Sequence, residues 1–97
     1  MNVNISAIHF EIAERLTDFI NKKAARLARH YPDMTDFDVK LKVVKPETAM
    51  NKEAGVQLNV PGNENLFASK TADSFEEAID LCLDALEKQL SRLKEKK

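Results

Sequence analysis

The alternation of hydrophobic and polar residues in the middle of the chain constrains the fold most strongly. In DFDVKLKVVK (36–45) hydrophobic residues alternate with charged ones, and GVQLNV (55–60) repeats the pattern with amide side chains at its polar positions. A period of two is typical of a strand with one buried and one solvated face. The sheet is therefore predicted to be covered on one side only. The residues predicted on its open face are Lys40, Lys42, Gln57 and Asn59.

Two further strands and two helices complete the pattern. Residues 3–8 and 64–72 read as strands, and residues 46–54 read as a polar loop. Residues 10–31 carry hydrophobic side chains at steps of three and four, which predicts a helix. This helix should end at about Tyr31, because a residue that precedes a proline disfavours the helical conformation. Ala13 stands near its start, where a serine or threonine cap would be expected.

A second, longer helix is predicted from residues 73–74 to the end of the sequence. Ser74 with Glu77, or Asp73 with Glu76, has the spacing of a capping box. The resulting order is β-α-β-β-β-α. A strand–helix–strand crossover makes the first two strands parallel, and the short later connections make the other pairs antiparallel. We predict one α+β domain over residues 1–97, a four-stranded mixed sheet with both helices packed on one face.

The chain lacks the residues that are typical of several functional classes of protein. The chain has 97 residues, one cysteine and a net charge of −1. It contains no motif of a nucleophilic, metal-dependent or phosphate-cradling enzyme, so no enzyme activity, cofactor, metal or small-molecule substrate is expected. Cys82 lies on the apolar side of the last helix and is expected to be a small buried hydrophobe. No signal peptide or membrane-spanning run is recognised, so a cytoplasmic location is expected.

Basic residues give the main functional lead. Lys22, Arg26 and Arg29 share one face of the first helix by spacing, with Lys23 at its border. Lys88, Arg92 and Lys96 share a face of the last helix. If the helices lie side by side, two rows of cations could line one groove and neutralise phosphates. The same bases also complement the helix dipoles, so solvated faces explain them equally well. Because the phenylalanines mostly occupy apolar positions, a nucleic acid would be recognised by shape and backbone.

The ordered set of segments resembles a known family. NVNISA, FEIAERLTDFINKKAARLARHY, DVKLKVVK, the ASK segment and SFEEAIDLCLDALEKQLSRLKEKK together cover nearly the whole chain. They are similar to segments of the short ribosome hibernation promoting factors and the ribosome-associated translation inhibitors, also called sigma-factor modulation proteins. The AID and LEKQL elements of the last segment are the most specific. The family's fold is the β-α-β-β-β-α arrangement predicted above.

The resemblance also implies a function. Family members bind ribosomal RNA of the small subunit between its head and body, overlap the messenger and transfer RNA sites, and silence idle ribosomes. The family's basic positions fall on Lys23, Arg26, Lys88, Arg92 and Lys94, whereas Ala85 stands where lysine is common. Lys22 and Arg29 are expected to compensate for such missing cations. The alternative is a non-catalytic protein-interaction module that uses the open sheet face or an edge strand.

Overall fold

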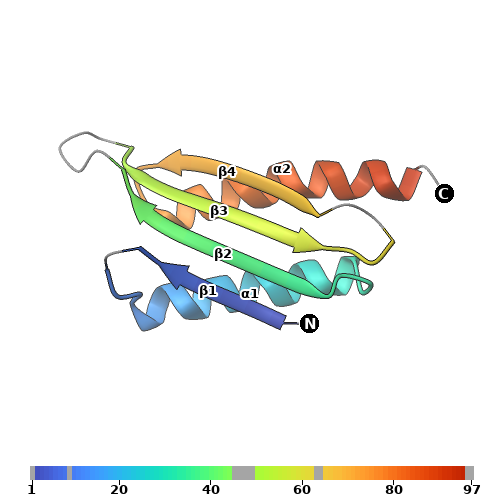
Figure 1. Cartoon of the computed structure of the whole chain (residues 1–97), viewed down its shortest axis with the longest axis horizontal. Helices are drawn as coiled ribbons and strands as arrows, with labels where there is room; N and C mark the ends of the chain where they lie inside the picture. The colour runs from blue at the N-terminus through green and yellow to red at the C-terminus, as the bar shows by residue number, and fades with distance from the viewer. Residues whose placement is uncertain (1, 9, 45–49, 63–64, 96–97) are drawn as a thin grey trace.

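The computed structural model describes residues 2–8, 10–44, 50–62 and 65–95. Its elements follow the predicted order (Figure 1). They are β1 (Asn2–Ala7), α1 (Glu14–His30), β2 (Asp36–Val43), β3 (Lys52–Asn59), β4 (Leu66–Ala72) and α2 (Phe75–Glu95). The α+β class and the β-α-β-β-β-α order are therefore confirmed.

The four strands form one mixed sheet in the order β1-β2-β3-β4. β1 runs parallel to β2, with Asn2 opposite Asp36, and the β2–β3 and β3–β4 pairs are antiparallel. Both helices lie behind the sheet in Figure 1, with α1 behind β1 and β2 and with α2 behind β3 and β4. One face of the sheet is thus covered and the other is open, as the alternating pattern predicts.

The core fills the space between the covered face and the two helices. Every second residue of β2, from Phe37 to Leu41, points into it and is at most 1% exposed. The largest side chains that are fully buried are Phe37, Ile20, Leu41, Leu58, Ile79, Leu86, Val39, Val56 and Cys82. Within the described residues, no buried side-chain nitrogen or oxygen lacks a hydrogen-bond partner. Burial of apolar area therefore stabilises this fold at little polar cost.

Local hydrogen bonds mark the end of α1 and the start of α2, whereas the start of α1 has no side-chain cap. α1 begins at Glu14 after Ala13, whose side chain offers no cap, and the N–H of Tyr31 closes the helix by donating to the Leu27 carbonyl at 3.0 Å. At α2 the Ser74 hydroxyl accepts a hydrogen bond from the Glu77 N–H at 3.1 Å, which is the first of the two predicted capping spacings.

Asp73 has a different role from the cap that its spacing with Glu76 suggested. Its carboxylate accepts the N–H of Met50 at 2.8 Å and so ties the start of α2 to the segment before β3. Met50 has a φ of 54°, in the left-handed region, and this hydrogen bond helps to hold that turn.

The predicted polar loop over residues 46–54 is too long at its end. β3 begins at Lys52, so residues 52–54 belong to the strand. Their polarity hides a regular alternation, because Ala54 is fully buried while Glu53 lies on the open face and forms an ion pair with Lys42. Residues 45–49 lie outside the described part of the chain.

Candidate nucleic-acid interface

Three cations from β4 and α2 surround one open hollow of about 500 Å³. Lys70 comes from β4, and Lys88 and Arg92 come from α2. Asp84 is the one acid in the lining, which Leu81, Ala85 and Gln89 complete. This excess of positive charge on an exposed, open surface is suited to phosphate groups.

Helix geometry explains why Lys88 and Arg92 lie on this side of α2. Each residue turns the helix by about 100°, so Lys88 comes about 900° after the buried Ile79, which is two and a half turns. Lys88 therefore points away from the core. Arg92 follows one turn later on the flank that faces β4. Gln89 fixes this flank, because its side-chain amide donates to the Phe67 carbonyl of β4 at 3.3 Å.

Lys70 is a site residue that the sequence reasoning missed. The alternation of β4 places it on the helix-covered face, where a lysine is unexpected, yet it is exposed. β4 is an edge strand, so a long lysine stem can run past α2 and keep its ammonium in water. The available signal was a charged residue at an inward position of a predicted strand.

The groove between the two helices is lined differently from the prediction. Its volume is about 280 Å³, and cations from α1 face acids from α2 across it. The cations are Lys23 and Arg26, and the acids are Asp80, Asp84 and Glu87. The hypothesis of two cation rows in one groove is therefore wrong in its geometry.

The reason again lies in the helical angles of α2. Asp80 comes about 100° after Ile79, and Glu87 comes about 800° after it, which is two full turns and about 80°. Both acids therefore lie on the same side of α2 and point towards α1, whereas Lys88 points outward. Lys23 is already engaged in this groove. Its ammonium lies 3.0 Å from the Asp80 carboxylate and 5.3 Å from the centre of the Phe19 ring.

The remaining predicted cations are more dispersed. Lys22 and Arg29 are exposed on α1, and neither makes an ion pair within the described residues. Lys94 belongs to α2, although its side chain is outside the described part, and Lys96 lies outside the described residues altogether. The structure thus gathers Lys88 and Arg92 with Lys70, and it places the α1 cations elsewhere.

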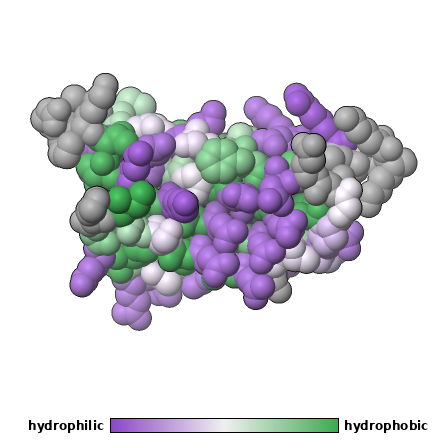
Figure 2. Space-filling model, viewed as in Figure 1, coloured by the Kyte–Doolittle hydropathy of each residue, from purple (hydrophilic) through white to green (hydrophobic). Residues whose placement is uncertain are grey.

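The open face of the sheet is mixed in character. Figure 2 shows hydrophilic residues over the middle of this face and hydrophobic residues towards its left end. The carboxylates of Asp36 and Asp38 accept hydrogen bonds from side-chain amides of neighbouring strands. The donors to Asp36 are Asn59, Thr35 and Asn2. These donors lower the pKa of Asp36, with Asn59 having the largest effect.

The described residues give little support for a reactive cysteine, a metal site or a membrane-spanning helix. Cys82 is fully buried, and its thiol donates to the Ala54 carbonyl at 3.2 Å. This burial confirms the expectation of a small buried hydrophobe, and it also raises the pKa of Cys82 to about 11. Within the described ranges no cluster of three potential metal ligands occurs. None of the helices described there combines the length and apolarity needed to cross a bilayer.

Comparison with known proteins agrees with the geometry. A family model described as "Sigma 54 modulation protein / S30EA ribosomal protein" matches residues 3–97. The ribosome hibernation promoting factor of Pseudomonas putida is 34% identical over 96 residues, which cover 99% of this chain and 89% of that protein. The Escherichia coli K12 protein of the same name is 32% identical over 96 residues, with 99% and 96% covered.

Two solved structures share the fold. The Protein Y N-terminal domain of Thermus thermophilus has a TM-score of 0.79 and 28% identity, with 96% of this chain and 99% of that chain covered. A ribosomal subunit interface protein of Coxiella burnetii has a TM-score of 0.85 at 21% identity, with 97% and 98% covered. From the family match and the curated relatives, this chain belongs to the sigma 54 modulation protein / S30EA ribosomal protein family.

Proposed function

We propose that this protein is a ribosome hibernation factor, which binds ribosomal RNA of the small subunit and blocks the messenger and transfer RNA sites. It acts in the cytoplasm, by occupancy and without catalysis. The observation that carries the proposal is the hollow between β4 and α2, where Lys70, Lys88 and Arg92 surround an open surface with a single acid. The names of the relatives, ribosome hibernation promoting factors, support the same reading.

Within this proposal the cations differ in what they can contribute. Lys88 and Arg92 make no ion pair within the described residues and point outward, so each can neutralise a phosphate without first losing a partner. Lys23 would have to break its ion pair with Asp80 before it could contact RNA. The acids opposite Arg26 weaken the electrostatic attraction between Arg26 and RNA. Lys22, Arg29 and Lys94 are proposed as peripheral phosphate contacts.

Co-sedimentation with purified small ribosomal subunits across a salt series tests the proposal. The logarithm of the binding constant should fall linearly with the logarithm of salt concentration. Lys88→Gln and Arg92→Gln should each reduce that slope by about 0.7–0.9, since each removes one phosphate contact. Asn21→Asp is the matched control, because it changes the net charge equally from an exposed position on α1 outside the hollow.

Two results would overturn the proposal. Binding that does not depend on salt would point to an apolar protein interface. An Asn21→Asp effect equal to that of Arg92→Gln would mean that net charge, and not the hollow, governs association.

A further inference from the structure

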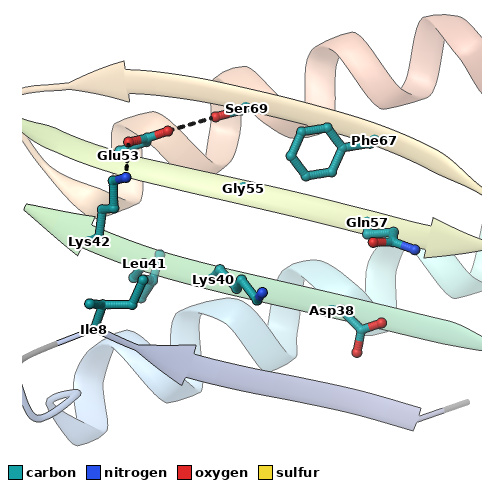
Figure 3. A pocket seen from close by; sticks show the side chains of 10 residues that line it. All are labelled: Ile8, Asp38, Lys40, Leu41, Lys42, Glu53, Gly55, Gln57, Phe67 and Ser69. Atoms are coloured by element: carbon teal, nitrogen blue, oxygen red, sulfur yellow. Dashed lines mark hydrogen bonds and ion pairs between the residues drawn. The ribbon is translucent and has the colours of Figure 1, made fainter. Parts of the chain in front are cut away.

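A second feature, on the opposite face of the sheet, is an exposed aromatic ring in a shallow hollow. Phe67 of β4 is 58% exposed, and it is thus an exception to the expectation that the phenylalanines mostly occupy apolar positions. It lies in a hollow of about 300 Å³ built across β2, β3 and β4 (Figure 3). This volume is at the small end for ligand sites and suits one planar group.

Gly55 makes room for the ring. A Cβ atom at this position would lie 3.4 Å from the tip of the Phe67 ring, so the ring leans over the glycine backbone. Glycine weakens a strand interior, and it often marks a place where another group approaches closely. Covering a glycine with a ring from the next strand is also a way to stabilise a sheet. That role alone leaves unexplained why more than half of the ring stays in water.

A cation without an ion-pair partner in the described chain lies beside the ring. The two acids of the hollow are already engaged: Asp38 accepts a hydrogen bond from Asn4 at 2.8 Å, and Glu53 has partners in Lys42 and Ser69. Lys40 lies beside Gly55 in the strand register and makes no hydrogen bond or ion pair within the described chain. Lys40 and Asp38 therefore both keep a charge without an ion-pair partner within the described residues, and Lys40 is the cation available to a phosphate.

Hydrogen-bonding groups flank the ring as well. The Gln57 side chain lies directly opposite Phe67 in the register, and it carries both a donor and an acceptor at the exposed surface. A ring for stacking, an amide for base edges and a nearby ammonium for phosphate together match the chemistry of an unpaired nucleotide. Stacking tolerates any base, because every base has a π face.

We infer that the open face of the sheet binds one unpaired nucleotide of a single-stranded RNA, with its base stacked on Phe67 and its phosphate near Lys40. This site is separate from the hollow between β4 and α2, which lies on the helix side of the sheet. The inference goes beyond the proposed function, because it adds base stacking to a backbone contact.

A tryptophan reporter tests the stacking directly. The chain contains no tryptophan, so Phe67→Trp introduces a single fluorophore at the site. Titration with a single-stranded RNA hexamer should quench its fluorescence, whereas an abasic phosphodiester of the same length should not. The quenching should persist when Lys88→Gln and Arg92→Gln are added, so this result is independent of the proposed function. The inference would be overturned if both oligomers quenched the fluorescence equally. It would also be overturned if the quenching disappeared once Lys88→Gln and Arg92→Gln were added.

An affinity measurement supplies the second arm. Phe67→Leu keeps an apolar side chain but removes the ring, and it should weaken hexamer binding by at least about fivefold, the lower end for one stacked base. Met50→Ala is the matched control, because Met50 is equally exposed at 58% and lies outside the hollow. Equal losses in both variants would indicate nonspecific apolar contact and refute the site. Absence of hexamer binding by the parent protein would refute the site, whatever Phe67→Leu does to small-subunit binding.

Discussion

Ala85→Lys should turn the hollow between β4 and α2 into a stronger phosphate site. Ala85 lines this hollow together with Lys70, Lys88 and Arg92, and it is only partly buried. A lysine there sits one turn before Lys88 and two turns before Arg92 on the same flank of α2. Its ammonium would join the existing cations without displacing a core side chain.

The expected gain follows from counterion release. One added phosphate contact steepens the salt slope by about 0.7–0.9. Over a tenfold fall in salt concentration, the variant should therefore gain about five- to eightfold in affinity relative to the parent protein. Crowding of like charges on the helix costs about 0.2–0.5 kcal/mol per pair, and Asp84 offsets part of this cost. The fold should remain intact, which thermal unfolding monitored by circular dichroism will check.

The assay is co-sedimentation with small ribosomal subunits at several salt concentrations, with parent and variant measured side by side. Asn21→Lys is the control, because it adds the same charge at an exposed site on α1 outside the hollow. A parallel shift of the binding line without a change of slope would refute the reasoning. So would an equal steepening by Asn21→Lys, since charge alone would then explain both variants.

Three further predictions concern the fold itself. Leu86→Ala should lower the free energy of unfolding in urea by about 2–5 kcal/mol, because Leu86 is fully buried, whereas Leu81→Ala at a 40% exposed site should cost far less; equal costs would contradict the assigned core. Cys82 should resist a thiol reagent in the folded protein at about pH 8 and react after unfolding, because its pKa is about 11, and rapid labelling of the native state would contradict its burial. The pKa of Asp36 is lowered from 3.8 by its hydrogen bonds, so its contribution to stability is fully present above that value and is lost as pH falls through the folded pKa. The difference in urea midpoint between parent and Asp36→Asn should accordingly shrink on acidification, and a difference that does not change with pH would rule out this linkage.

The sequence predicts the fold well where periodicity and capping act locally. The alternation in β2 and β3 identifies the covered face because one residue in two must be buried. The capping spacing of Ser74 and Glu77 locates the start of α2 within a residue. The start of β3 at Lys52 was missed, because Lys52 and Glu53 have the composition of a loop and only strand pairing reveals their alternation.

The candidate site is less predictable, because it depends on which sides of the helices face each other. Spacing shows that Lys88 and Arg92 share a flank of α2, but not whether that flank faces α1 or β4. The structure places it beside β4, and the acids Asp80 and Glu87 face α1 instead. Lys70 joins the site only through the sheet order, which local pattern does not determine.

The parallel pairing of β1 with β2 has a kinetic consequence. β1 is an edge strand, and its hydrogen bonds join residues 34 positions apart, such as Asn4 and Asp38, across the whole of α1. β2, β3, β4 and α2 instead follow one another through short connections. Because long loops close slowly, β1 should dock last during folding and open first from the native state. Its amide hydrogens should exchange with solvent earlier than those of β3, which is a central strand and packs against α2.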